Sequence, residues 1–184
     1  MTTSFVLAVL LFSLTASFAA GDPCNNVPTM TWEEACVKAC ATDPDNAARL
    51  ELCKQTLQSG PDSAEVTVYV LIATRLAKLK YEDTMAEMDQ MMGPGNLGAD
   101  EKAAISLCKK KYGEASSLLA SVNDQLFACD LSRVRQEFID AQVAVGACQN
   151  SMWAYQSMSL LTKVSADNDL TVVAYLLGAL IVGR

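Results

Sequence analysis

The sequence predicts an all-α protein, in which a short helical hairpin precedes an up-down-up-down four-helix bundle and disulfides tie the helices together. Composition is the first indication: 51% of the 184 residues are hydrophobic, only 7% are aromatic, and the strong helix formers Ala, Leu, Met and Lys are frequent. Apolar residues also recur at helical spacings over four long segments. Short clusters of Gly, Pro, Asp and Ser interrupt the chain where interhelical links would lie.

The first twenty residues are typical of a secretory signal peptide. Residues 5–19 are almost wholly apolar, and the small residues Ala20 and Gly21 follow as a cleavage site. The alternative is an N-terminal membrane anchor, but the apolar run is short for a spanning helix and the small residues favour removal. We therefore expect a signal peptide over 1–20 and an exported domain over 21–184.

A helical hairpin is predicted over 31–58. The residues Thr-Trp-Glu-Glu at 31–34 form a capping-box pattern, which begins a helix that continues to about Ala41. The turn formers Asp-Pro-Asp-Asn follow at 43–46, and a second helix is expected from about Asn46 to Leu57. Ser-Gly-Pro-Asp then ends the hairpin.

Four longer helices are predicted to form a bundle over 63–182. Their expected spans are 63–92, 99–127, 132–153 and 168–182. Each carries an apolar stripe at spacings of three, four and seven residues, as in Val66, Val70 and Ala73; Cys108, Ala115 and Val122; Val134, Phe138 and Val145; Leu170, Val173 and Leu177. Short links between most of them favour antiparallel neighbours. The last helix, over 168–182, is too short to span a bilayer and is expected in the core.

Seven cysteines follow the signal peptide, and export implies that they form disulfides. They are Cys24, Cys36, Cys40, Cys53, Cys108, Cys129 and Cys148. Because seven is odd, at least one is left over. Residues equidistant from a tight turn lie at the same height on two antiparallel helices. A turn near residue 130 then places Cys108 within one turn of Cys148, which predicts a disulfide between them.

The same geometry applies to the leading hairpin, whose turn centres near residue 44. The residue at the same height as Cys36 on the second helix is about residue 52, which favours a Cys36–Cys53 bond. The chain before Thr31 is long enough for Cys24 to fold back onto Cys40 as a possible third pair. Cys129 would then be the spare thiol at the tip of a turn, most simply a partly buried structural cysteine.

Charge and motif content exclude several classes of function. The net charge is −7 and the pI is near 4.5, which disfavours nucleic acids and anionic membranes as partners but suits a basic protein. The sequence has no His and no nucleotide-binding or nucleophile motif, so we expect no catalytic residues, no metal site and no cofactor. The Cys36–Cys40 spacing does not match a zinc finger.

Several segments carry a resemblance to a known family. Residues 53–64 combine a cysteine, a following Leu and a Pro-x-Ser-Ala helix start. Residues 107–112 place a Tyr four positions after Cys108, and small residues lead up to Cys148. Leu-Thr-Lys at 161–163, Asn-Asp at 168–169 and the apolar tail follow. In this order and spacing, over about 30–182, the chain resembles the plant invertase and pectin methylesterase inhibitors.

The resemblance implies a protein that binds and occludes a cell-wall carbohydrate-active enzyme in the apoplast, and that is a monomer when free. Invertase inhibitors of the family can present Pro-Lys-Phe early in the third bundle helix, where this chain has Leu131, Ser132 and Arg133. These three residues are the candidate target-contact segment. Their departure from the invertase type gives a small preference for pectin methylesterase, as against acid invertase. Ala147 also replaces the usual Thr before the fourth cysteine of the family.

Two other functions remain open from the sequence. One is an extracellular helical carrier of a small ligand such as a lipid, although the adjacent Cys-Cys pair of plant lipid-transfer proteins is missing. The other is a structural or storage role without inhibition. Saturable uptake of a fluorescent fatty acid would distinguish the carrier.

Overall fold

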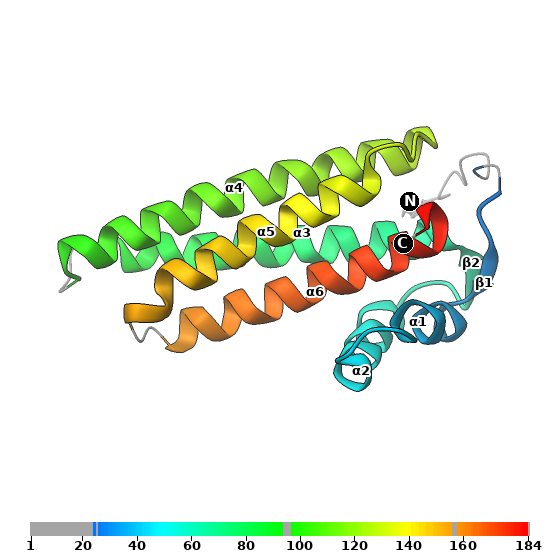
Figure 1. Ribbon diagram of the computed structural model, residues 1–184, viewed down its shortest axis with the longest axis horizontal. Helices are drawn as coiled ribbons and strands as arrows, with labels where there is room; N and C mark the ends of the chain where they lie inside the picture. The colour runs from blue at the N-terminus through cyan, green and yellow to red at the C-terminus, as the bar shows by residue number, and fades with distance from the viewer. Residues whose placement is uncertain (1–23, 25, 94–96, 156–157, 184) are drawn as a thin grey trace, which may run out of the picture.

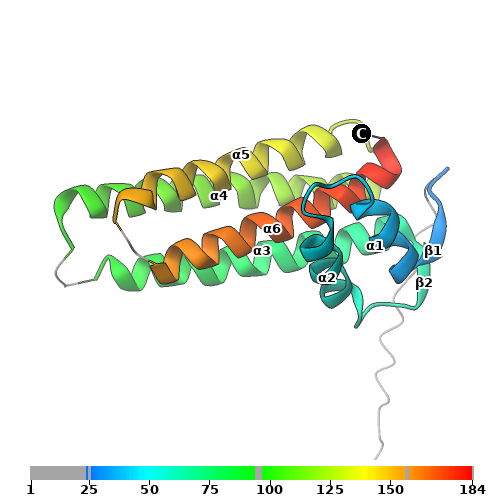
Figure 2. The same ribbon diagram turned by 60° about the horizontal axis from the view of Figure 1, so that its bottom comes forward.

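The structure is a computed structural model that describes Cys24 and residues 26–93, 97–155 and 158–183. The predicted signal peptide over 1–20 lies outside the described residues. Four long antiparallel helices form the bulk of the molecule: α3 (Val66–Met91), α4 (Ala99–Ala128), α5 (Val134–Met152) and α6 (Met158–Val182). Their order is up-down-up-down (Figures 1 and 2), and each packs against two bundle neighbours, which confirms the predicted four-helix bundle.

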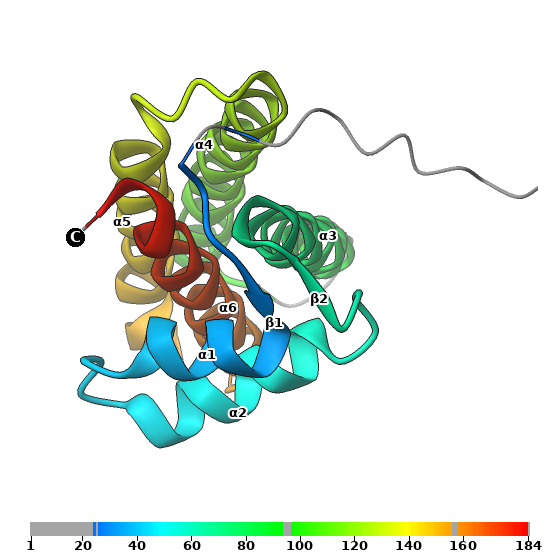
Figure 3. The same ribbon diagram turned by 90° about the vertical axis from the view of Figure 1, so that its right-hand side faces the viewer.

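The leading hairpin consists of α1 (Trp32–Cys40) and α2 (Asn46–Leu57), which lie across α6 and α3 near one end of the bundle (Figure 3). Thr31 caps α1, because its hydroxyl oxygen accepts a hydrogen bond of 3.2 Å from the Glu34 amide. Arg49 of α2 forms ion pairs of 3.3 Å with Asp43 and 3.2 Å with Asp169. It thereby links the hairpin turn to α6.

Two short strands that the sequence did not predict lie at the same end of the bundle. β1 (Thr29–Thr31) pairs antiparallel with β2 (Ser63–Glu65), with Met30 opposite Ala64. The Val66 amide donates to the Pro28 carbonyl at 3.0 Å, and the Tyr69 hydroxyl donates to the Met30 carbonyl at 2.9 Å. The ladder therefore fixes the segment before α1 against the start of α3, and α3 begins at Val66 rather than at the expected Ser63.

Helix α6 begins at Met158, ten residues before the predicted start at 168. Polar residues such as Thr162 and Ser165 obscure the apolar periodicity in the first part of α6. Leu160 and Val164 are nevertheless buried on its core side. The full helix is long and apolar enough to cross a membrane, so the argument from shortness was wrong. Because 56% of its most apolar stretch is buried and it packs against α3, α5 and α1, its setting is that of a core helix.

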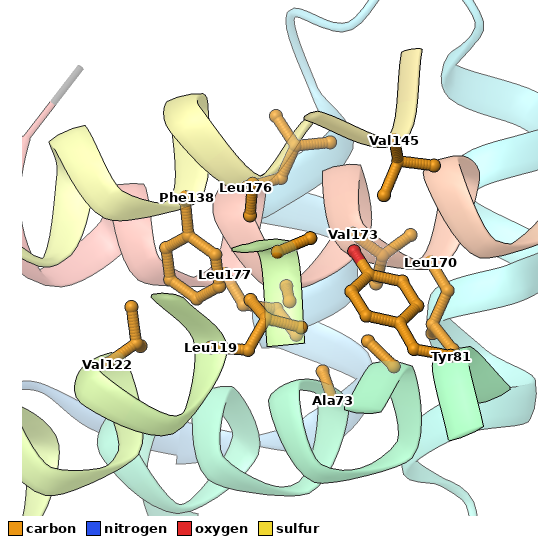
Figure 4. Close-up of a cluster of buried hydrophobic side chains, with 14 of the residues drawn as sticks. Ala73, Tyr81, Leu119, Val122, Phe138, Val145, Leu170, Val173, Leu176 and Leu177 are labelled. Atoms are coloured by element: carbon orange, nitrogen blue, oxygen red, sulfur yellow. The ribbon is translucent and has the colours of Figure 1, made fainter. Parts of the chain in front are cut away.

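The centre of the bundle is a continuous apolar core (Figure 4). Phe138 of α5 lies against Gly178 of α6, where an added Cβ would come within 3.1 Å of the Phe138 ring. Glycine therefore allows α5 and α6 to approach closely at this level. The buried set drawn from all four long helices includes Ala73, Tyr81, Leu119, Val122, Phe138, Val145, Leu170, Val173 and Leu177.

Candidate protein-binding site at one end of the bundle

Two disulfides are the pairs that the sequence predicted. Cys36 and Cys53 join α1 to α2 with their Cα atoms 5.7 Å apart, and Cys108 and Cys148 join α4 to α5 at 4.4 Å. All four residues have no exposed surface. The bonds therefore hold each helical pair from within its core.

The third pair differs from the expected one. Cys24 is bonded to Cys129, with a Cα–Cα distance of 5.4 Å, and Cys40 is a buried thiol on α1. The β1–β2 ladder gives the physical reason, because it directs the preceding chain across the end of the bundle towards α4 (Figure 3). Cys40 lies at the far end of α1, roughly 13 Å along a helix that leads away from this strand.

The candidate contact segment lies in the link between α4 and α5, next to this third disulfide. Helix α4 ends in a Schellman motif with Cys129 in the left-handed conformation at φ 54°. The Asp130 amide donates to the Gln125 carbonyl at 3.0 Å, and the Cys129 amide donates to the Leu126 carbonyl at 3.4 Å. The backbone before Leu131 is therefore fixed by the helix end itself.

Three side chains form a clasp around the same link. Gln125 donates from its amide nitrogen to the Glu137 carboxylate at 2.7 Å and accepts from the Arg133 backbone amide at 3.2 Å. The Arg133 guanidinium lies 2.7 Å from the other Glu137 oxygen, although Arg133 is 73% exposed and Glu137 only 2%. A buried carboxylate needs such partners. We call Gln125, Arg133 and Glu137 the clasp.

Asp130 orders the first residues of the link. Its carboxylate accepts a hydrogen bond of 3.3 Å from the Ser132 amide, a turn that Asp commonly forms with the backbone two residues on. Hydrogen bonds from the side chain and backbone of Ser132 lower the pKa of the Asp130 carboxyl. The turn therefore keeps its charge-assisted contact in mildly acidic solution.

The link presents a mixed surface to solvent. Leu131 packs partly against the core, whereas Ser132 and Arg133 are exposed. Phe127, at the end of α4, is 63% exposed, and the Arg75 guanidinium lies over its ring at 5.3 Å from the centroid. Exposed aromatic and Arg side chains on a stiff backbone are typical of protein interfaces.

This architecture matches solved structures of known proteins. A mutant form of a pectin methylesterase inhibitor from Arabidopsis superposes with a TM-score of 0.70 at 13% sequence identity, over 79% of this chain and 96% of that chain. A pectin methylesterase inhibitor from Arabidopsis thaliana gives 0.60, also at 13% identity, over 77% and 92% of the two chains. The chain has the fold of the pectin methylesterase inhibitors. No family model and no curated protein matches its sequence.

Two small pockets lie beside α2 in the part of the chain that the structure describes. They have volumes of about 170 and 220 Å³ and open at the junction of α2 with the bundle. Leu52 lines both. Among the described residues no group of His, Cys, Asp or Glu side chains could hold a metal ion. The link between α4 and α5 is an exposed segment whose backbone is held by a helix cap, a disulfide and the clasp.

A buried polar cluster also joins three helices of the inhibitor fold. Asp167 of α6 is 4% exposed, and its carboxylate accepts hydrogen bonds of 2.7 Å from Thr84 of α3 and 3.0 Å from Tyr112 of α4. Thr171 donates to the Asp167 carbonyl at 2.7 Å and also bonds the Tyr81 hydroxyl. Burial raises the pKa of the Asp167 carboxyl, although the two hydroxyl donors oppose it.

Sequence reasoning missed both polar clusters. Glu137 and Asp167 fall on the core side of their helices, and this was the signal that could have revealed them. A single acidic residue on an apolar stripe is a weak indication, because its partners lie on other helices and cannot be identified from spacing. The predicted segment Leu131, Ser132 and Arg133 does lie in one exposed link, held by the clasp.

Proposed function

We propose that the mature chain is a secreted inhibitor that binds a pectin methylesterase and covers its active-site cleft. The fold supports this proposal, because two solved structures that it resembles are pectin methylesterase inhibitors. Three disulfides suit an oxidising environment outside the cell, and the predicted signal peptide would deliver the chain there. The apoplast is the corresponding location in a plant.

The clasped link between α4 and α5 is the observation that carries the contact part of this proposal. Its backbone is fixed by a helix cap, a disulfide and the clasp, so little conformational entropy is lost on binding. Arg133 keeps most of its side chain exposed while one nitrogen pairs with Glu137. A standard interface would bury about 1,600 Å² in total, which requires helix surface beside the link as well.

An inhibition titration with the oxidised mature chain tests the function directly. Residual activities of purified pectin methylesterase and acid invertase would be measured across about pH 4 to 7 with increasing amounts of the chain. We expect saturable inhibition of the methylesterase with much weaker inhibition of the invertase. Inhibition of the invertase alone would transfer the proposal to that enzyme. If micromolar concentrations of the chain left the activity of both enzymes unchanged, the proposal would be contradicted.

Substituting Arg133 tests the contact segment. We expect Arg133→Glu to weaken methylesterase inhibition by roughly tenfold or more, because a charged side chain at the centre of an interface is a common hot spot. Arg135→Glu is the matched control, since Arg135 is also exposed on α5 but lies outside the clasp. Equal effects of the two substitutions on the inhibition constant would argue against a contact at Arg133. Circular dichroism would verify that both variants fold, and amide hydrogen exchange at 130–133 would verify that the link stays ordered after Arg133→Glu removes the ion pair with Glu137.

The carrier alternative has less support. Small-molecule sites usually enclose about 300–1,000 Å³, whereas the two pockets beside α2 are smaller and open to solvent. No observation favours the storage role.

A further inference from the structure

The three disulfides differ in how far solvent can reach them. Cys36, Cys53, Cys108 and Cys148 are completely buried. In the third bond Cys129 is exposed, at the tip of the link between α4 and α5, and Cys24 is 9% exposed. Because a reductant must approach a sulfur atom to attack it, access distinguishes this bond from the other two.

The bond fastens a short piece of chain, which we call the strap: Cys24, Asn26 and Val27. Besides the disulfide, the Cys24 amide donates to the Glu65 carboxylate at 3.1 Å, and Val27 packs partly against the core. From Pro28 onward the chain is held independently by the bond to Val66 and by the β1–β2 ladder. Opening the disulfide would therefore release the strap while β1 stays in place.

The other end of the bond is the link that carries the contact segment. Cys129 is two residues before Leu131, which packs partly against the core near the helix end. With the bond intact, the link is anchored covalently at Cys129 and by the clasp at Arg133. Without it, the clasp and the helix cap alone would hold the link.

We propose that Cys24–Cys129 is a selectively reducible bond that controls the order of the α4–α5 link. A dithiol reductant attacks the sulfur of the exposed residue Cys129, the S–S bond breaks, and Cys24 leaves as a thiolate that takes up a proton. The second thiol of the reductant then displaces Cys129 from the mixed disulfide, so the reductant is oxidised by two electrons and both cysteines end as thiols. The control of inhibition rests on the proposed function, whereas selective reduction does not.

Alkylation after graded reduction tests the selectivity. The folded mature chain would be treated with dithiothreitol near pH 7, quenched at intervals with an alkylating reagent, and mapped by peptide mass spectrometry. We expect Cys24 and Cys129 to be labelled roughly tenfold or more faster than the four buried cysteines, with far-UV circular dichroism unchanged. Labelling of all three pairs together, or of a buried pair first, would overturn the proposal, as would loss of helix when the first pair opens.

A variant that lacks the bond tests its consequence for the link. For Cys24→Ser/Cys129→Ser, we expect amide hydrogen exchange to rise by about tenfold at residues 129–133 and to stay unchanged in the middle of α4 and α5. The same variant should inhibit methylesterase more weakly than the oxidised chain. Unchanged exchange in the link would refute control by this bond. If the wild-type chain inhibits neither enzyme, the proposed function is contradicted. The labelling and exchange results would still test selective reduction and its effect on the link.

Discussion

Asp167 shows how one buried side chain can make the bundle sensitive to pH. Its carboxyl pKa is raised in the folded state by burial, and the positive charges of Lys80 and Lys163 act in the opposite direction. A carboxyl with a raised pKa holds its proton more tightly in the folded than in the unfolded chain. Folding is then favoured most when the group is protonated, and this contribution falls as pH rises through the folded pKa.

Asp167→Asn is expected to remove this loss of stability at higher pH. Asn keeps an oxygen that can accept hydrogen bonds from Thr84 and Tyr112. The free energy of unfolding of the variant, relative to that of wild type, should therefore increase as pH rises from about 4 to 7. Urea denaturation at several pH values measures this difference. Asp124→Asn is the control, because Asp124 is exposed on α4. A difference between Asp167→Asn and wild type that does not change with pH would contradict the assignment.

Asp167→Ala tests the hydrogen bonds rather than the charge. It leaves the hydroxyls of Thr84 and Tyr112 without their acceptor inside the bundle, and we expect it to lower the free energy of unfolding by about 1–3 kcal/mol. Urea denaturation of both variants near pH 5 makes the comparison. Equal stabilities of the Ala and Asn variants would show that these bonds contribute nothing.

The partners of single residues were predictable from the sequence where they lie on two helices joined by a turn, and were missed where they lie far apart along the chain. The Cys108–Cys148 and Cys36–Cys53 pairs follow from two helices joined by a turn. The Cys24–Cys129 pair spans 105 positions and depends on where β1 directs the chain. Asp167 likewise gains its partners from α3 and α4, which only the packed bundle brings together.

Among the elements, α6 shows most clearly how packing depends on one residue. We expect Gly178→Val to lower the free energy of unfolding by about 1–3 kcal/mol, because an added Cβ comes within 3.1 Å of Phe138 and the core must shift. Gly113→Ala on α4 is the matched control. Nothing lies within 4 Å of its added Cβ, so alanine should raise stability by about 0.5–1 kcal/mol. Thermal melts of both variants would measure the two changes in stability. A change of the same sign at both sites would contradict the assignment of close packing to Gly178.

The link between α4 and α5 can be loosened without touching its surface. Gln125→Ala removes the amide that contacts both Glu137 and the Arg133 backbone, so the buried carboxylate loses one partner. We expect hydrogen exchange at 130–133 to increase and stability to fall by about 1–3 kcal/mol. Gln136→Ala, at an exposed position on α5, serves as the comparison. Equal exchange in both variants would mean that the clasp does not order the link.

Element boundaries were predictable where breakers mark them and not elsewhere. Gly93 and Pro94 follow α3, and the turn formers at 43–46 separate α1 from α2, as expected. The start of α6 was placed ten residues too late, because polar residues on its outer side obscure the period. The β1–β2 pair is three residues long on each side, too short to give any alternation that a strand prediction could use.

For the molecule as a whole, the two buried disulfides should differ in their contribution to stability. Cys108–Cys148 closes 40 positions and Cys36–Cys53 closes 17, which correspond to about 4 and about 3 kcal/mol in the chain-entropy model. We expect paired Cys→Ser substitution of the first to lower the denaturation midpoint more than that of the second. Denaturant unfolding of both double variants gives the order, and a larger loss from the shorter loop would contradict the model.

The up-down-up-down path also has a practical consequence. Helix α6 ends at Val182 on the same end of the bundle as the link after α4, and Cys24 is bonded into that link (Figures 1 and 3). An affinity handle, fluorophore or display fusion next to Cys24 or Val182 would therefore crowd the surface that we propose as the target contact. The opposite end, where Trp153 is 75% exposed, is the place to immobilise the molecule on a sensor so that the proposed contact segment points into solution.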